Sequence, residues 1–195
     1  MVITMNDPHQ AAPSGDHMDL VLSAARSGGE WAWALIYGDL APAVLGYLGA
    51  KGVTDPEDVL GEVFLQAVRN LDSFDGDYRG FRAWLFTIAH RRMVDHHRRG
   101  ATRPGVVPDH DLDMHGPIGD VEEESLLRVQ ADSAVAAIRM LTPDQRDVLL
   151  LRLVADLSAQ EVARILGKRP EAVKALQRRG LAALHKKISL APVPE

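Results

Sequence analysis

Residues 157–184 read LSAQEVARILGKRPEAVKALQRRGLAAL, and this segment carries the clearest local pattern in the chain. Ser158 and Glu161 form the S-x-x-E pattern of a capping box, which marks the start of a helix. Pro170 stands where the first residue of a second helix belongs, and Gly167 supplies the turn between the two helices. A short helix, a tight turn and a longer helix together predict a helix-turn-helix.

The longer of these helices has two distinct faces. At about 100° per residue, Val173, Leu176, Gly180 and Leu184 form one narrow stripe, which we expect to face a core. The opposite side is basic, since residues 164–187 hold eight Lys or Arg and one Glu. Such a helix suits the major groove of DNA, where Arg and Lys reach guanine edges. The alternative is a basic helix end in solvent, stabilised by the helix dipole.

The composition extends the helical prediction to the whole chain of 195 residues. The sequence holds 25 Ala and 24 Leu but only 7 Ile and 5 Thr, which predicts an all-α fold. Without Cys, the chain can form no disulfide, thiolate metal site or cysteine nucleophile. No apolar run reaches the roughly 18 residues of a membrane span, and the N-terminus lacks a secretory signal. We therefore expect a soluble, cytoplasmic protein with no membrane insertion.

The helical signals fall into two groups, which predict two small domains. The predicted divisions are a disordered tail over 1–17, a first domain over 18–100, a linker over 101–122 and a second domain over 123–190. The predicted helices cover 19–27, 30–49, 55–71 and 79–99 in the first domain, and 123–140, 143–155, 158–166 and 170–188 in the second. The linker is rich in Pro and Gly and has no helical period, so we expect it to be flexible.

Charge is sorted along the chain, so the net charge of −5 hides two basic clusters. Residues 79–103 hold seven Arg and one Asp, and the second cluster is the basic helix described above. Between them, residues 101–133 hold eight acidic and two basic residues. Two basic clusters on either side of an acidic connector indicate nucleic-acid binding at two places.

Residues 79–100 combine aromatic and basic side chains on one predicted helix. Aromatic rings such as Phe81 and Trp84 lie in its first half, and arginines fill its second half. Aromatic rings beside cations can stack on exposed bases and follow phosphates. Just before this helix, Phe74 and Tyr78 flank a Gly/Asp turn that could hold an unstacked base. The alternative is that the aromatic side chains simply form a core.

Residues 55–71 predict an amphipathic helix with Asp55 as its N-cap. Asp58, Glu62 and Arg69 point away from its broad apolar face, and Leu65 lies among them. An exposed Leu surrounded by charges suggests a contact with another protein, although single exposed apolar residues are common.

Two clusters resemble metal or catalytic sites but fit them poorly. They are His90, Asp95, His96 and His97, and Asp109, Asp111 and Asp113. The first cluster lies on a basic helix, and the second has Met114 where a calcium loop needs Gly. The sequence has no Gly-rich phosphate loop and no G-x-S-x-G motif. We therefore expect no catalytic residue, no metal and no cofactor, and a protein that is not an enzyme.

Three segments in this order resemble the extracytoplasmic-function (ECF) sigma factors of bacterial RNA polymerase. They are DPEDVLGEVFLQAVRNLDSFDG, FRAWLFTIAHRRMVDHHRR and LTPDQRDVLLLRLVADLSAQEVARILGKRPEAVKALQRR. The resemblance covers about 30–100 and 130–188. It implies an alternative sigma factor with a region 2 domain and a region 4 domain. Both domains would bind promoter DNA and core polymerase, and promoter melting would start transcription.

The resemblance also implies roles for particular residues. Contacts with the β′ clamp helices of polymerase would come from Asp58, Glu62, Leu65 and Arg69. Melting of the −10 element would use Phe74, Tyr78, Arg79, Arg82, His90, Arg91, Arg98 and Arg99. Recognition of the −35 element would use Lys168, Arg169, Glu171, Lys174, Ala175, Arg178 and Arg179. The linker would run toward the polymerase active centre, and the β flap and an anti-sigma factor would be further partners.

The chain departs from the family pattern at Gly61, where Gln is usual, at Arg91, where Asn is common, and at residues 168–172, which lack the usual Thr. These departures affect which promoter is read rather than the class of protein. Two other classes stay open on the residues alone. One is a stand-alone helix-turn-helix regulator, and the other is a metal-dependent hydrolase that uses the His cluster.

Overall fold

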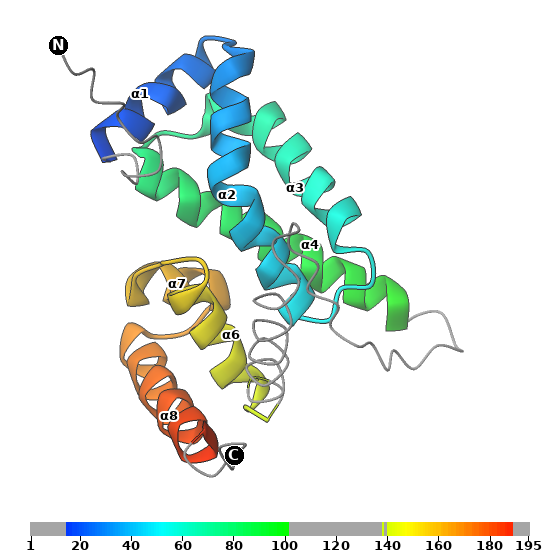
Figure 1. Ribbon diagram of the computed structural model, residues 1–195, viewed down its shortest axis with the longest axis vertical. Helices are drawn as coiled ribbons and strands as arrows, with labels where there is room; N and C mark the ends of the chain where they lie inside the picture. Colours follow the sequence, from blue (N-terminus) through cyan, green and yellow to red (C-terminus); the bar gives the residue numbers. More distant parts are fainter. Residues whose placement is uncertain (1–14, 102–137, 139, 189–195) are drawn as a thin grey trace, which may run out of the picture.

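A computed structural model describes residues 15–101, 138 and 140–188 (Figure 1). Every regular element within these residues is helical, which confirms the all-α prediction. The N-terminal helices are α1 (Gly15–Arg26), α2 (Glu30–Ala50), α3 (Pro56–Asn70), the 3-10 turn η1 (Leu71–Ser73) and α4 (Tyr78–Ala101). The C-terminal helices are α6 (Pro143–Leu153), α7 (Ala159–Leu166) and α8 (Pro170–Ile188). Residues 1–14 of the predicted tail, residues 102–122 of the predicted linker and nearly all of the predicted helix 123–140 lie outside the described residues.

Local capping signals set the start of the helix-turn-helix. Ser158 accepts a hydrogen bond from the backbone N–H of Glu161, whose carboxylate accepts one from the Ser158 N–H, so the predicted capping box is confirmed. Thr142 and Gln145 form a second capping box at the start of α6. Gly167 has φ of 63°, the left-handed conformation that a tight helix end requires.

Three details differ from the sequence prediction. Helix α1 begins at Gly15, four residues before the predicted start at 19 and inside the predicted tail 1–17. Asp55 occupies the N-cap position of α3, but its side chain makes no capping hydrogen bond. Helix α6 ends at Leu153 rather than at 155. The chain turns there because Asp156 adopts a φ of 51°, which a continuing α-helix does not allow.

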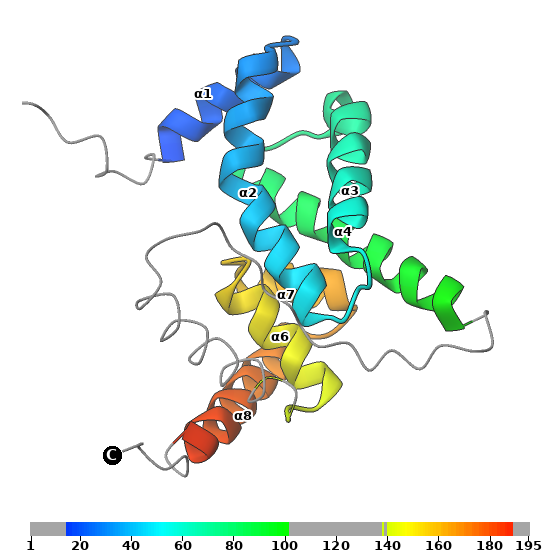
Figure 2. The same cartoon turned by 45° about the vertical axis from the view of Figure 1, so that its right-hand side comes forward.

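The N-terminal helices pack around α2, which contacts α1, α3 and α4 (Figures 1 and 2). Its inward side chains are fully or almost fully buried: Ala32, Ile36, Leu40, Ala41, Val44, Tyr47 and Leu48. Phe81, Leu85 and Phe86 of α4 are also buried completely. The alternative that we kept open for the aromatic half of α4 is therefore correct for Phe81 and Phe86, because both rings belong to the core.

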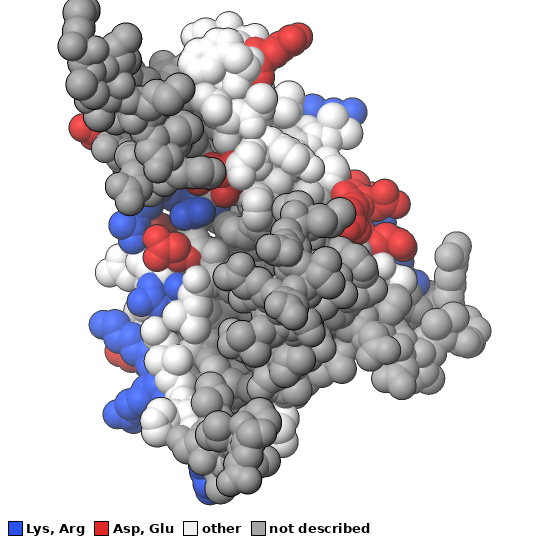
Figure 3. All heavy atoms as spheres, viewed as in Figure 1, with Lys and Arg blue, Asp and Glu red and all other residues white. Residues whose placement is uncertain are grey.

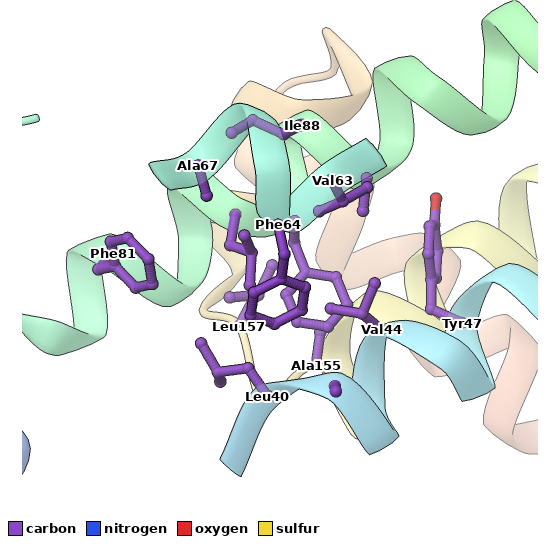
Figure 4. Packing of buried hydrophobic residues seen from close by; sticks show 14 of the residues in the cluster. Leu40, Val44, Tyr47, Val63, Phe64, Ala67, Phe81, Ile88, Ala155 and Leu157 are labelled. Carbon is purple, nitrogen blue, oxygen red and sulfur yellow. The ribbon is translucent and has the colours of Figure 1, made fainter. Parts of the chain in front are cut away.

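The C-terminal helices form the helix-turn-helix, with α8 packed on α6 and α7. They also touch the N-terminal helices, because α7 contacts α4 and α6 contacts α2. Ala155 and Leu157, in the turn before α7, belong to the same buried cluster as Leu40, Val44 and Phe64 (Figure 4). One apolar core thus runs through both groups of helices. None of the described helices is both long and apolar enough to cross a membrane.

Candidate nucleic-acid interface

Helix α8 separates a buried seam from an exposed basic face. Val173 is completely buried, Leu176 packs against the core, and a Cβ on Gly180 would lie 2.9 Å from Leu149 Cδ1. The opposite side, which we call the outer face of α8, consists of Glu171, Lys174, Ala175, Arg178 and Arg179. Four of these five residues are exposed, and Ala175 is half-buried. The predicted orientation of the helix is therefore confirmed, and Lys and Arg side chains line its outer edge (Figure 3).

Neighbouring helices fix the position of α8. Arg152 of α6 donates a hydrogen bond from Nε to Gln177 Oε1 at 3.1 Å and a second one to the Leu157 carbonyl. At the start of the helix, Lys168 is paired with Asp144 of α6 at 2.8 Å. The Gln177 contact lies on the inner side of α8, and the Lys168 pair lies just before its first residue. They leave the outer face free to approach a large partner.

Helix α4 presents a second basic surface. Arg79, Arg91, Arg98 and Arg99 are exposed along it. Arg82 is half-buried, and its guanidinium lies 4.0 Å from the Asp39 carboxylate. Four of the five predicted arginines are therefore accessible to a phosphate backbone.

The loop between η1 and α4 holds the two predicted base-stacking rings, and the structure places them differently. Phe74 is half-buried, with its ring centre 5.3 Å from that of Trp84. Tyr78 is only 9% exposed, and its hydroxyl donates a hydrogen bond to Asp39 Oδ2 at 2.7 Å. Burial and this hydrogen bond raise the pKa of Tyr78. Its ring packs parallel to that of Phe81, so it is unavailable to stack on a base in this arrangement.

Contacts from α1 and α2 to this loop were missed by sequence reasoning. Asp39 contacts Tyr78, as described above, and Asp19 accepts a hydrogen bond from the Tyr78 backbone N–H at 2.6 Å. Arg26 donates hydrogen bonds to two carbonyl groups of the loop. These partners lie 39 to 59 residues apart in the sequence, where no local pattern can reveal them.

His90 lies on the inner side of α4 rather than among its exposed cations. Its Nδ1 is 2.8 Å from the Tyr47 hydroxyl, and burial lowers its pKa below the usual value for His. Lys51 and Asp147, which form an ion pair, act on the His90 pKa in opposite directions, so burial remains the main cause of the shift. A neutral, half-buried ring in this position supports packing between helices more readily than a contact with phosphate.

The predicted His cluster does not assemble a metal site in the structure. His97 Nε2 hydrogen-bonds to the Lys51 carbonyl at 3.1 Å, and burial lowers its pKa as well. In the part of the chain that the structure describes, no three His, Asp or Glu side chains are grouped so that they could hold a metal ion. Asp109, Asp111 and Asp113 lie outside the described residues.

The outer side of α3 forms a shallow groove with α4. Its lining residues are Glu62, Leu65, Gln66, Arg69, Asn70 and Arg92. Leu65 is 50% exposed, and Arg92 bridges Glu62 at 3.2 Å and Gln66 at 2.9 Å. Three of the four residues predicted to contact another protein therefore share one surface, while Asp58 lies exposed one turn earlier on α3. Arg92 was missed because it comes from a different helix.

Comparison with known proteins matches the two groups of helices to two protein families. The Sigma-70 region 2 family matches residues 36–103, and the Sigma-70 region 4 family matches residues 132–184. The chain is 32% identical over 180 residues to the ECF RNA polymerase sigma factor BldN of Streptomyces coelicolor. That alignment covers 91% of this chain and 67% of BldN.

Two solved structures share the fold. The first is CnrH in complex with the cytosolic domain of CnrY, with a TM-score of 0.61 and 24% identity over 90% of this chain and 99% of that chain. The second is the sigma factor RpoE in complex with the anti-sigma factor NepR from Bartonella quintana. It has a TM-score of 0.64 and 19% identity over 82% of this chain and 98% of that chain.

Proposed function

The chain belongs to the ECF sigma factors, and from this we propose how its surfaces divide the work of transcription initiation. The protein is an alternative RNA polymerase sigma factor that initiates transcription. In our proposal, the region 2 domain spans 18–100 and the region 4 domain spans 123–190, joined by the acidic linker 101–122. Each domain contributes a basic surface to promoter DNA, and the first also binds polymerase.

The outer face of α8 reads the −35 element in this proposal. The observation that carries it is the separation of roles on α8: the seam through Val173 and Gly180 makes the packing contacts, and the basic side makes none with the core. Lys174 and Arg178 then reach base edges or phosphates, and half-buried Ala175 allows the helix to come close to the groove. Lys168 and Arg169 lie just before the first residue of α8, where they can contact the DNA backbone.

The loop and the exposed arginines of α4 open the −10 element. Phe74 is the partly exposed ring that can receive a base, and Arg79, Arg91, Arg98 and Arg99 follow the phosphates. Capturing flipped bases offsets an unstacking cost of a few kcal/mol per step, so melting needs no hydrolysis. The chain accordingly acts without catalytic residues or a cofactor. Tyr78 and His90 support the loop and the helix rather than touching DNA.

The groove between α3 and α4 binds the β′ clamp helices of core polymerase. Leu65 supplies an apolar contact, and Asp58, Glu62 and Arg69 surround it with charge, as the rim of a protein interface requires. The C-terminal helices contact the β flap, and the acidic linker enters the basic channel toward the active centre. We further infer an anti-sigma partner, since the similar RpoE was solved with one. All of this takes place in the cytoplasm, with the polymerase.

In vitro transcription with purified core polymerase tests this proposal. A promoter-containing template should yield specific transcripts only when the chain is added, and core alone should yield none. The chain alone should bind the duplex promoter weakly. Tight duplex binding without core, together with no effect on transcription, would instead identify a stand-alone helix-turn-helix regulator.

A further inference from the structure

We propose that Arg26, the last residue of α1, is a positioning residue for promoter melting, because it holds the loop 74–78 in place. The inference rests on the proposed role of that loop at the −10 element. Helix α1 lies before the segment matched by the region 2 family, which begins at residue 36.

One guanidinium makes three contacts with the loop. Nη2 of Arg26 donates hydrogen bonds to the carbonyls of Phe74 at 3.1 Å and of Gly76 at 3.0 Å. The Arg26 Cζ also lies 5.6 Å from the centre of the Phe74 ring, within the range of a cation–π interaction. Arg26 therefore fixes both the backbone of the loop and the ring that we assign to base capture.

The end of α1 is built to hold this guanidinium steady. The Gly29 N–H donates to the Ala24 carbonyl at 2.9 Å and the Gly28 N–H to the Ala25 carbonyl at 3.1 Å, the pattern of a Schellman motif. Gly28 has φ of 84°, which this motif requires and which other residues adopt with strain. Ala25 itself is buried, so the last turn of α1, which ends at Arg26, is attached to the core.

A second contact from the same side of α1 reaches the other end of the loop. Asp19 lies two turns before Arg26, so both side chains project from one side of the helix. Asp19 Oδ1 accepts the hydrogen bond from the Tyr78 N–H at 2.6 Å. Helix α1 thus holds the beginning of the loop with a donor and its end with an acceptor.

The loop also makes a close internal contact. It is tightest at Gly76, where a Cβ would lie 2.8 Å from Phe74 Cζ, so the ring is packed against its own backbone. A loop that is already ordered spends less conformational entropy when it captures a base. Loss of Arg26 should therefore weaken base capture and leave distant surfaces unchanged.

The test compares Arg26→Ala and Arg26→Lys with the wild type, each as the full chain assembled with core polymerase. Two quantities are measured: affinity for core, and affinity of the holoenzyme for a single-stranded −10 oligonucleotide. Arg26→Ala should weaken oligonucleotide binding about five- to ten-fold and change core affinity by less than about two-fold. Arg26→Lys should recover part of the loss, because Lys still donates to the carbonyls. Glu30→Gln, an exposed charge change at the start of α2, serves as the control and should change neither quantity.

Amide hydrogen exchange of the free protein supplies a readout of the loop itself. Arg26→Ala should speed exchange in residues 74–80 about ten-fold while leaving α8 unchanged. The inference is overturned if Arg26→Ala leaves both oligonucleotide binding and loop exchange unchanged, or if it lowers core affinity and oligonucleotide binding equally. If the wild-type holoenzyme itself fails to bind the −10 oligonucleotide, the proposed function of the loop is wrong, which is a separate result.

Discussion

Lys51 at the end of α2 and Asp147 in α6 form an ion pair that joins the N-terminal helices to the C-terminal helices. Their side chains are only 14% and 17% exposed, and they lie 96 residues apart in the sequence. The Asp147 charge also acts on Tyr47 and His90, which hydrogen-bond to each other at 2.8 Å, although burial still leaves the pKa of His90 below its usual value. Polar contacts and the continuous apolar core therefore both hold the two groups of helices together.

Breaking this ion pair should destabilise the folded chain. Asp147→Asn or Lys51→Met leaves one charge partly buried without its partner, which we expect to cost about 1–3 kcal/mol in the free energy of unfolding. The double variant should lose less than the sum of the two single variants, because it leaves no unpaired charge. Urea denaturation checks this, and strictly additive losses would show that the two residues do not interact in solution.

Stability should fall in mildly acidic solution. Burial keeps the folded-state pKa of His90 and His97 below the unfolded value of about 6.5. The stability that comes from their neutral forms is fully present above that pH and is lost as the pH falls through the folded-state pKa. The charges of Asp147 and Lys51 act on His90, whereas those of Lys51 and His96 act on His97. Because the two rings have different surroundings, each should be tested separately with His90→Gln and His97→Gln.

Each of these variants should reduce the change in urea midpoint between about pH 7.5 and pH 5.5. His185→Gln, at an exposed position on α8, is the control and should leave that change as it is in the wild type. A pH dependence that persists in full in both His variants would show that other groups cause it.

Tyr78→Phe should affect stability more than DNA binding. The variant removes the hydrogen bond to Asp39, and we expect a loss of about 1 kcal/mol in the free energy of unfolding. The ring stays in the core, so oligonucleotide binding by the holoenzyme should change by less than about two-fold. Phe74→Ala should instead weaken that binding strongly. Equal effects of the two substitutions on binding would contradict the assignment of base capture to Phe74.

Substitution of Lys174 and Arg178 by Ala should abolish −35 recognition and leave core affinity intact. If each side chain contacts DNA, the salt dependence of binding should become shallower by about one unit of slope per lost phosphate contact. Lys186→Ala, an exposed cation near the end of α8, is the matched control. A loss of core affinity in the double variant would argue against the −35 assignment.

Leu65→Asp should weaken binding to core polymerase about ten-fold or more, since it places a charge at the centre of an apolar contact. Leu65 is exposed, so the thermal midpoint should hardly move. Val68→Ala removes a similarly exposed apolar side chain outside the groove and serves as the comparison. Unchanged core affinity for Leu65→Asp would remove the groove from the polymerase interface.

The features that were predictable from the sequence are those that depend on residues a few positions apart. The capping box at Ser158, the turn at Gly167 and the seam through Val173 follow from local spacing, and the structure confirms them. The roles of Tyr78 and His90 depend instead on Asp39 and Tyr47, which come from α2. An aromatic or imidazole ring near cations looks the same in the sequence whether it faces DNA or a neighbouring helix. Only packing decides between them.

Helix α8 is divided into a packed seam and an outer face whose basic side chains make no packing contacts with the core. This division has an evolutionary consequence. The exposed side chains at 171, 174 and 178 can be exchanged at little cost to folding, so new preferences for the −35 sequence can arise there by single substitutions. The loop 74–78 has no such freedom, because Phe74, Gly76 and Tyr78 contact α1, α2 and one another. Relatives that diverge in the upstream sequence they select can therefore retain one apparatus for strand separation.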